Sequence, residues 1–401
     1  MTQPDGKQAL RILTINSGSS SVKFSLFRMA ASQEEVLVGS LERIGQRGSL
    51  FHVQDAQGER LQDRHLELSD HDAAFQTLFD WLKEHGPDQK LEAVGHRVVH
   101  GGAEYTRPHR ITPEMMAALK KLVALAPDHL PHEIKAIQAV SRIYPDLEQA
   151  ACFDTSFHRK MPKIAQLYAL PRSLWHAGVR RYGFHGLSYE YILSELKKEA
   201  GEQVANGRLI IAHLGNGASM AAVRDGKSVD TTMGYTPAGG LVMSTRSGDL
   251  DPGVVLYLLE ERGLRAASVN DMLNQYSGLL GISGVSSDMK ELLEKEQENP
   301  QVAEAVQLFC YQAKKFLGAF VAVLGGLDTL VFTAGIGENA PAIRARICDG
   351  LQSFGIEVDP ERNQANSAVI SSEGAPVTVR VMKTNEELMI ARHTYNLIVS
   401  K

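Results

Sequence analysis

Two stretches of this chain repeat one pattern, in which a short apolar run enters a glycine- and serine-rich loop and continues as a second apolar run. The first copy is LRILTI, residues 10–15, then NSGSSS, then the run Val22–Phe27. The second begins near Leu209, where LIIAHLGNGAS leads into MAAV. Each copy predicts a strand, a tight loop and a second strand. Chance similarity of glycine loops is one explanation, and a duplicated domain with a cleft between the copies is the other.

A third glycine loop, AGIGEN, comes after the apolar run TLVFT and is expected to precede a helix over residues 340–351. Capping residues and apolar periodicity predict further helices. They cover residues 73–85, 112–125, 131–143, 188–200, 251–262 and 300–324, with a last helix after Thr384. Because strands and helices alternate, the fold class is α/β. We expect one domain to comprise residues 1–150 with 386–401 and the other residues 151–385.

Composition narrows the classes of function. With 42 basic and 47 acidic residues the net charge is −5, and no long basic run suggests nucleic-acid binding. Cys152, Cys310 and Cys348 are too scattered for a disulfide framework or a zinc site, and we expect them to be buried. The N-terminus carries no signal-peptide pattern, and the longest apolar run, residues 316–327, is too short to span a bilayer. We therefore expect a cytoplasmic protein without a membrane partner.

The glycine loops are candidates for phosphate binding, because glycine allows the backbone to approach a ligand closely. NSGSSSVK lacks the GK[ST] ending of a Walker A loop. Its last residue, Lys23, is nevertheless expected to lie within reach of a phosphate. HLGNGAS and AGIGEN do not fit the dinucleotide fingerprint GxGxxG, so a nicotinamide site is disfavoured. An ordinary turn explains each loop taken alone, but three in one chain favour a nucleotide.

Several side chains in or beside glycine-rich segments suit the recognition of anions and metal ions. Arg97 in GHRVVHGG and Arg246 in STRSGDLDP offer planar donors for carboxylate or phosphate, the alternative being surface ion pairs. His185 in YGFHG is either a buried structural histidine or a catalytic one. Asp154 in FDTSFH and Glu386 in TNEEL supply hard oxygen ligands for Mg²⁺, or are a strand-end and a helix-start carboxylate.

Taken in order along the chain, these motifs resemble those of the acetate kinase family of short-chain carboxylate kinases. The set is NSGSSSVKF, GHRVVHGG, FDTSFH, RRYGFHG, HLGNGAS, STRSGDLDP, GVSSDMK, AGIGEN and TNEEL, and it runs from the first strand to the last helix. The resemblance implies two duplicated α/β domains of the actin and sugar-kinase (ribonuclease H-like) type around a central active site, and a homodimer. It also implies reversible transfer of the ATP γ-phosphoryl group to a carboxylate, giving an acyl phosphate and ADP.

The resemblance assigns roles motif by motif. Arg97, Asp154, His185 and Arg246 are the expected catalytic residues. The expected substrate-binding residues are Arg97, which holds the acceptor carboxylate, and Val99, Phe184 and Pro237, which line a small apolar pocket. The expected metal ligands are Asn16 and Glu386, for Mg²⁺ with Mn²⁺ as the alternative ion. The expected ATP-binding residues are Lys23, His213, Leu214, Gly215, Asn216, Gly217, Asp288, Met289, Lys290, Gly335, Ile336, Gly337, Glu338 and Asn339.

The chain departs from the family pattern at three places. Asp128 stands where the family usually has an acyl-pocket leucine, Ala238 and Gly239 replace a common Leu-Glu pair, and Lys290 replaces an arginine that contacts the base. The first two leave acetate, propionate, butyrate and a hydroxylated acid open as acceptors, and the third leaves the nucleotide preference open. A non-catalytic actin-like nucleotide-binding module is the alternative of a different class. It would keep the glycine loops without needing Arg97, Arg246 and His185 together.

Overall fold

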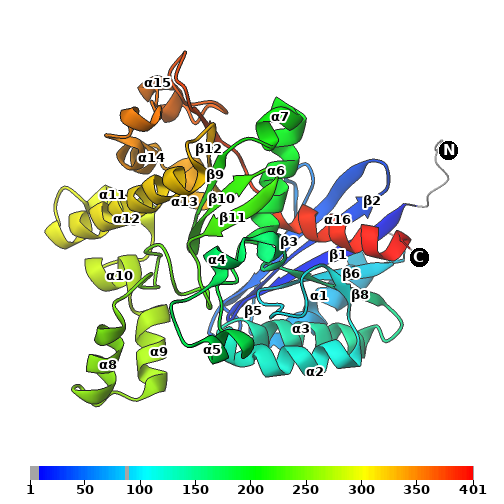
Figure 1. The fold of residues 1–401 in the computed structure, drawn as a ribbon. Coiled ribbons are helices and arrows are strands. Elements are labelled where there is room, and N and C mark those ends of the chain that lie inside the picture. The colour runs from blue at the N-terminus through cyan, green and yellow to red at the C-terminus, as the bar shows by residue number, and fades with distance from the viewer. Residues whose placement is uncertain (1–8, 86–89, 401) are drawn as a thin grey trace. The chain divides into compact units, whose positions relative to one another are not determined.

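The computed structural model describes residues 9–85 and 90–400, and the chain divides into two compact units (Figure 1). Unit 1 is Met1–Ser156 with Asn385–Lys401, and unit 2 is Phe157–Thr384. The boundary predicted at residue 150 falls inside strand β8 (Glu148–Phe153), which belongs to unit 1. Residues 1–8, where no leader segment is predicted, lie outside the described residues.

Unit 1 is built on an eight-stranded sheet in the order β5-β4-β3-β2-β1-β6-β8-β7. Strand β1 pairs antiparallel with β2 and parallel with β6, and β6 pairs parallel with β8. The other bounds are β1 (Leu10–Ser17), β2 (Ser21–Met29), β3 (Gln33–Glu42), β4 (Ser49–Asp55), β5 (Arg60–Leu66), β6 (Ala93–Val98) and β7 (His109–Arg110). Parallel neighbours bring the ends of β6 and β8 to the same edge of the sheet, which positions the residues directly after them.

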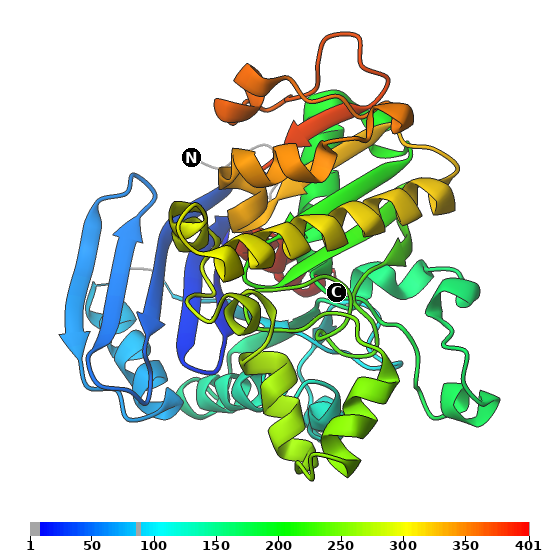
Figure 2. The same ribbon diagram turned by 90° about the vertical axis from the view of Figure 1, so that its left-hand side faces the viewer.

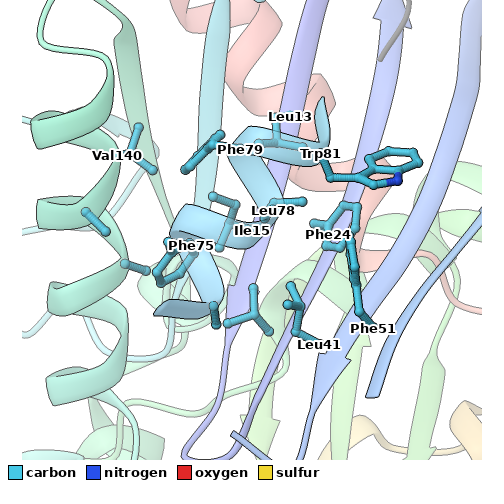
Figure 3. Close-up of a cluster of buried hydrophobic side chains, with 14 of the residues drawn as sticks. Leu13, Ile15, Phe24, Leu41, Phe51, Phe75, Leu78, Phe79, Trp81 and Val140 are labelled. Atoms are coloured by element: carbon cyan, nitrogen blue, oxygen red, sulfur yellow. The ribbon is translucent and has the colours of Figure 1, made fainter. Parts of the chain in front are cut away.

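Helices cover both faces of this sheet. On one face α1 (His71–His85) and α3 (Leu130–Ile143), with α2 (Pro113–Leu122) against α3, pack over an apolar cluster that includes Phe24 and Phe75 (Figure 3). On the other face α16 (Glu386–Val399) packs against β1, β6 and β8. Burial of these side chains stabilises the unit by about 25 cal/mol for each Å² of apolar surface removed from water. The C-terminal helix is thus part of the core of unit 1.

Unit 2 has a five-stranded sheet in the order β11-β10-β9-β12-β13. Its strands are β9 (Leu209–Leu214), β10 (Ala218–Arg224), β11 (Lys227–Thr231), β12 (Thr329–Thr333) and β13 (Thr378–Val381). The 25-residue helix α12 (Pro300–Leu324) runs along one face of the sheet, and α6 (Gly186–Ala200) packs on β9 (Figure 2). The remaining α-helices are α4 (Lys163–Gln166), α5 (Arg172–His176), α7 (Glu202–Ala205), α8 (Pro252–Glu260), α9 (Ala266–Gln275), α10 (Gly278–Ser283), α11 (Met289–Lys295), α13 (Ala334–Asn339), α14 (Pro341–Cys348) and α15 (Pro360–Gln364).

The predicted duplication is confirmed by the pairing of the strands. In unit 2, β9 pairs antiparallel with β10 and parallel with β12, and β12 pairs parallel with β13. This repeats the arrangement of β1 with β2, β6 and β8 in unit 1. The α/β class is therefore confirmed, and the sheet of unit 2 repeats the order and pairing of the five strands β3-β2-β1-β6-β8 of unit 1.

Local helix signals also agree with the structure. Thr112 accepts a hydrogen bond from the Met115 N–H at the start of α2, and Asp251 accepts one from Gly253 N–H at the start of α8. The prediction for AGIGEN is wrong, because these six residues are themselves helix α13, and the next helix, α14, ends at Cys348. The three cysteines are buried, as expected. Among the described residues, no helix combines the length and apolar character that a bilayer crossing requires.

Candidate active site

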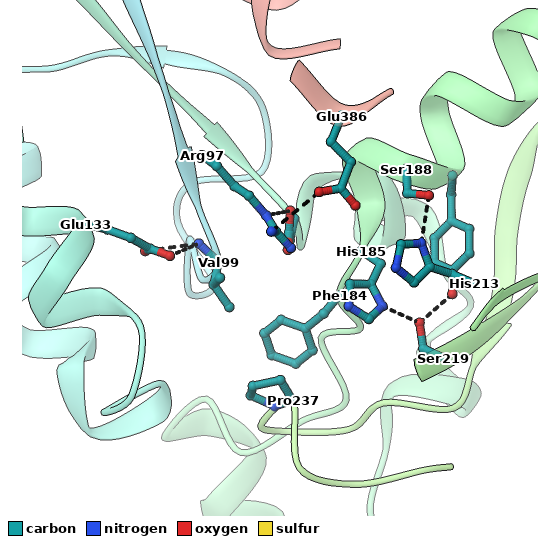
Figure 4. A network of polar contacts seen from close by, with 12 residues as sticks. Arg97, Val99, Glu133, Phe184, His185, Ser188, His213, Ser219, Pro237 and Glu386 are labelled. Atoms are coloured by element: carbon teal, nitrogen blue, oxygen red, sulfur yellow. Dashed lines mark hydrogen bonds and ion pairs between the residues drawn. The ribbon is translucent and has the colours of Figure 1, made fainter. Parts of the chain in front are cut away.

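Arg97 lies near the end of β6, where the neighbouring strand β8 delivers Asp154. Its Nε donates to both carboxylate oxygens of Asp154, at 3.1 and 3.2 Å, and its Nη2 donates to Oδ2 at 2.7 Å. The side chain of Asp154 is 1% exposed, and Glu386 Oε2 lies 3.4 Å from Arg97 Nη1 (Figure 4). Burial alone would lower the pKa of Arg97, but the two carboxylates raise it above its ordinary value. The guanidinium group of Arg97 is therefore held in one orientation and stays charged.

Glu386 is the first residue of α16, and Asn385 caps that helix by accepting a hydrogen bond from Leu388 N–H at 2.8 Å. The next residue, Glu387, has a pKa raised by burial and by the charge of Glu386, with opposing contributions from Arg97 and Lys23. Of the predicted residues in unit 1, the structure therefore gathers Arg97, Asp154 and Glu386 into one network, with Lys23 within electrostatic reach of it.

Asn16 and Lys23 are paired across the antiparallel strands β1 and β2, beside the tight loop that joins them. Lys23 is exposed, whereas the Ser17 hydroxyl is buried and has no hydrogen-bond partner in the described part of the chain. A buried hydroxyl without a partner is costly, so this loop has capacity for a polar ligand. Amide and carboxylate oxygens such as those of Asn16 and Glu386 are ligands of the kind that Mg²⁺ takes, together with water and phosphate oxygens.

The residues of unit 2 form a second polar cluster around Gly217, in the loop between β9 and β10. His185 Nδ1 shares a hydrogen bond of 2.8 Å with Ser219 Oγ, which also contacts the Tyr189 hydroxyl at 2.5 Å. His213 Nδ1 shares one of 2.8 Å with Ser188 Oγ (Figure 4). The His185 and His213 rings stack with centroids 4.1 Å apart. Both imidazoles are therefore oriented by hydroxyl groups.

Gly217 brings the backbone of this loop against His185 and Arg246. A Cβ atom added at Gly217 would lie 3.1 Å from His185 Nε2 and 3.6 Å from Arg246 Nη1. Arg246 Nη1 donates to the Pro237 carbonyl at 3.1 Å. His185 itself has φ 58°, in the left-handed region, directly before α6. A non-glycine residue in that region is held there by its surroundings, and such strain often lies at functional sites.

The apolar residues predicted for the acyl pocket belong to different units. Val99 in unit 1 is buried directly after β6, and Phe184 and Pro237 are buried in unit 2, Phe184 next to His185 in the chain. The backbone N–H of Val99 donates to both oxygens of Glu133, a buried acid on α3 that none of the sequence motifs includes. Its only sequence signal is a carboxylate on an apolar helix face, beside Leu130 and Ile134.

The predicted nucleotide-binding segment 335–339 is stabilised by hydrogen bonds from side chains of its own unit. Glu338 Oε1 accepts hydrogen bonds from the backbone N–H groups of Ala334, at 2.8 Å, and Thr384, at 3.1 Å. Arg344, which also lies outside the sequence motifs, is fully buried and donates to the carbonyls of Gly337 and Glu338 at 2.9 and 3.0 Å. The Glu338 carboxylate is thus engaged with the protein, and Gly335 and Asn339 are the exposed residues of this helix.

The remaining predicted residues lie at the edges of elements. Leu214 ends β9 and is buried, and Gly215 N–H donates to Gly217 O at 3.1 Å. Asp288 caps α11 by accepting from Lys290 N–H at 2.8 Å, and both side chains are exposed while Met289 is buried. Asp128 is partly exposed and lies close enough to His132 to influence its pKa. No cluster of three or more His, Cys, Asp or Glu side chains suited to a metal was found within residues 9–85 and 90–400.

Comparison with known proteins agrees with this geometry. The sequence model of the Acetokinase family matches residues 11–392. An acetate kinase of Rhodopseudomonas palustris is 46% identical over 392 residues, covering 96% of this chain and 98% of that protein. The crystal structure of Porphyromonas gingivalis acetate kinase has a TM-score of 0.87 at 38% identity, and that of a Francisella tularensis propionate kinase has a TM-score of 0.91 at 38% identity. Each covers 97% of this chain and 100% of the other. The chain belongs to the acetokinase family.

Proposed function

We propose that this protein is an acetate kinase, which transfers the γ-phosphoryl group of ATP directly to a carboxylate oxygen of acetate. The products are acetyl phosphate and ADP, and the reaction is reversible. The observation that carries the proposal is the guanidinium of Arg97, fixed by Asp154 and Glu386 at the end of a parallel strand. A planar, permanently charged fork of this kind suits a small carboxylate. Family membership supports the same reaction class.

On the acceptor side, Arg97 holds the carboxylate and Val99 contacts the acyl group. Asp154 acts through Arg97. Its two carboxylate oxygens accept hydrogen bonds from Nε and Nη2 of Arg97 and so fix the orientation of the guanidinium group. An acetate anion has no proton to lose, so Asp154 is not needed as a general base. The acceptor oxygen is already a nucleophile, and the protein's task is alignment and charge neutralisation.

On the phosphoryl side, His185 and Arg246 donate to the equatorial oxygens of the group in transfer. The support is the closeness of both side chains to Gly217, which brings two donors to one glycine loop. Hydrogen-bond donors held in place before the reaction stabilise the transition state without reorganisation. Ser219 positions His185 by a hydrogen bond to Nδ1, and we assign Nε2 to the phosphoryl group.

Asn16 and Glu386 would hold Mg²⁺, with Mn²⁺ as the alternative, and the buried Ser17 hydroxyl is a further polar group at that loop. When bound, the ion neutralises charge on the β- and γ-phosphates. The nucleotide itself would contact Lys23, the loop 213–217, the segment 288–290 and helix α13. This assignment is supported by the exposure of Gly335 in α13 and of Asp288 and Lys290 at the start of α11.

We also propose a homodimer that works in the cytoplasm, where ATP is supplied. Helix α8 supports the dimer, because none of its residues is buried and three large apolar side chains, Val254, Leu256 and Tyr257, are 43%, 52% and 50% exposed. Several large apolar side chains exposed on one helix are typical of a protein interface. Light scattering should give a dimer for the wild type and a monomer for Leu256→Lys, whereas Leu61→Lys, at an exposed apolar residue of unit 1, should stay dimeric. A monomeric wild type would refute the dimer.

The enzymatic proposal is tested by trapping the acyl phosphate with hydroxylamine. The purified protein is incubated with ATP, Mg²⁺ and one of acetate, propionate, butyrate, lactate or glycolate, and hydroxamate is measured over time. We expect acetate to have the highest kcat/KM. A higher value for propionate or another acid would assign a different carboxylate kinase, and no product with any acid would favour the non-catalytic module.

A further inference from the structure

Val99 occupies a special position in the backbone of unit 1. It comes directly after the last residue of β6, where the parallel pairing with β8 ends as Asp154 N–H donates to the Val98 carbonyl at 3.1 Å. The Val99 N–H therefore needs an acceptor outside the sheet, since a buried backbone donor without one is costly. Glu133 supplies it, with its two carboxyl oxygens 3.1 and 3.2 Å from the nitrogen.

Glu133 is an unusual residue for its surroundings. It lies in the first turn of α3, is 3% exposed, and has the buried side chains of Leu130, Ile134 and Ile137 on the same helix. Burial of a carboxylate is expensive unless it is compensated. Here burial raises the pKa of Glu133 to about 8, against smaller opposing contributions from the Val99 N–H and Arg97. At neutral pH the group is therefore mostly a neutral hydrogen-bonding carboxyl.

The hydrogen bond between Val99 and Glu133 lies beside the residues proposed to bind the carboxylic acid. Val99 is two residues beyond Arg97, so the peptide that Glu133 holds connects the carboxylate-binding fork to the apolar side chain proposed to touch the acyl group (Figure 4). We propose that Glu133 is a positioning residue for the carboxylic acid, which fixes the spacing and direction of Arg97 and Val99 by anchoring the Val99 N–H. This inference rests on the proposed function.

The test compares residues of equal size that differ in their ability to accept a hydrogen bond. Glu133→Gln keeps an oxygen for the Val99 N–H, whereas Glu133→Met fills the space without one. Glu133→Asp retracts the carboxyl by one methylene and serves as the second perturbing variant if Glu133→Met does not fold. Val140→Ala is the control, because Val140 is fully buried on the same helix and packs in the apolar core.

Steady-state kinetics are measured for acetate and ATP in all variants, below the melting temperature of each. We expect Glu133→Met, and to a lesser extent Glu133→Asp, to raise KM for acetate by about tenfold, the effect of a lost buried hydrogen bond, with kcat and KM for ATP changed less than about twofold. Glu133→Gln should restore the acetate KM to within about threefold of the wild-type value, and Val140→Ala should lower thermal stability without this selective change.

Two results would overturn the inference alone while the wild type remains an active acetate kinase. One is an unchanged acetate KM in both Glu133→Met and Glu133→Asp. The other is an equal rise in Val140→Ala, which would make the effect a general result of a weakened core. A wild type that forms no acyl phosphate from any acid would instead refute the proposed function, and the role of Glu133 in it.

Discussion

Five strands of each sheet have the same order and pairing, but the segments that follow two corresponding strands, β6 and β12, differ. In unit 1 that strand, β6, carries Arg97 near its end and runs into an extended loop. In unit 2 its counterpart, β12, ends at Thr333, turns through Ala334 at φ 64° and becomes helix α13. One copy therefore presents a charged side chain at the end of the strand, and the other presents the start of a helix.

The partners of the charged and polar groups differ in the same way. Arg97 in unit 1 is held by carboxylates, whereas His185 and His213 in unit 2 are held by serine hydroxyls. A carboxylate fixes a guanidinium through two strong hydrogen bonds but offsets part of its charge. Hydroxyl groups orient an imidazole without adding negative charge. The duplicated strands therefore supply the same frame in both units, and the side chains placed on that frame differ in charge and in their hydrogen-bond partners.

The largest effect is expected when the guanidinium of Arg97 in unit 1 is removed. Arg97→Ala leaves Asp154, which is 1% exposed, with a buried uncompensated charge. We expect kcat/KM for acetate to fall by about a thousandfold or more and unfolding free energy to fall by about 3–5 kcal/mol. The control Arg110→Ala removes an exposed ion pair with Glu148 and should cost less than about 1 kcal/mol. Chemical denaturation and hydroxamate kinetics measure both, and near-normal activity of Arg97→Ala would exclude it from the site.

The second prediction concerns Arg246 in unit 2. Arg246→Lys should keep ATP binding but lower kcat by about a hundredfold, or about 3 kcal/mol, because one ammonium does not reproduce a planar fork on a phosphoryl group. Arg224→Lys, at an exposed position on β10, should leave kcat unchanged. Calorimetry for the nucleotide and steady-state kinetics for turnover separate the two effects. A kcat like that of the wild type would remove Arg246 from the mechanism.

The third prediction uses pH to separate Glu133 from the carboxylates that pair with Arg97. An acid whose pKa rises from 4.5 to about 8 on folding binds more protons folded than unfolded. Its contribution to stability is therefore full below pH 4.5 and is lost progressively as the pH rises through about 8. Relative to Glu133→Gln, the wild type should lose about 3 kcal/mol of unfolding free energy between pH 6 and pH 9. Denaturant titrations at each pH measure this difference, and parallel curves for the two proteins would show that Glu133 does not titrate in this range.

The fourth prediction concerns the metal. Glu386→Ala should raise the Mg²⁺ concentration for half-maximal activity by about tenfold and leave KM for acetate less affected, because the carboxylate acts on the ion. Glu361→Ala is the matched control, since Glu361 is an exposed acid in the first turn of α15. An equal Mg²⁺ requirement in all three proteins would limit Glu386 to starting its helix and pairing with Arg97.

The smallest effect is expected at Lys290, which is exposed in the first turn of α11. A flexible ammonium stacks on a purine less well than a guanidinium plane does. Lys290→Arg should therefore increase the preference for ATP over GTP by about two- to fivefold in kcat/KM. The same ratio in both proteins would place Lys290 away from the base.

Much of this protein could be predicted from local sequence. The strand–loop–strand copies were recognisable because apolar runs broken by glycine and serine specify turns, and helices such as α2 and α8 begin at residues whose side chains cap them. The failure at AGIGEN has a physical cause in the tertiary structure. Glu338 accepts hydrogen bonds from Ala334 and from Thr384, which is far along the chain, and this stabilises a helix where the local sequence suggests a loop.

The sequence by itself determined the α/β class and the set of motifs that mark the family, because each signal depends on residues that are near one another in the chain. It suggested the duplication, which the strand pairing then confirmed. The tertiary structure decided which residues of those motifs lie together. Only the parallel pairing of β6 with β8 brings Asp154 to Arg97, 57 residues away. Only the packing of α3 buries Glu133 against Val99. Contacts of this kind arise from strand order and helix packing, which no local pattern encodes.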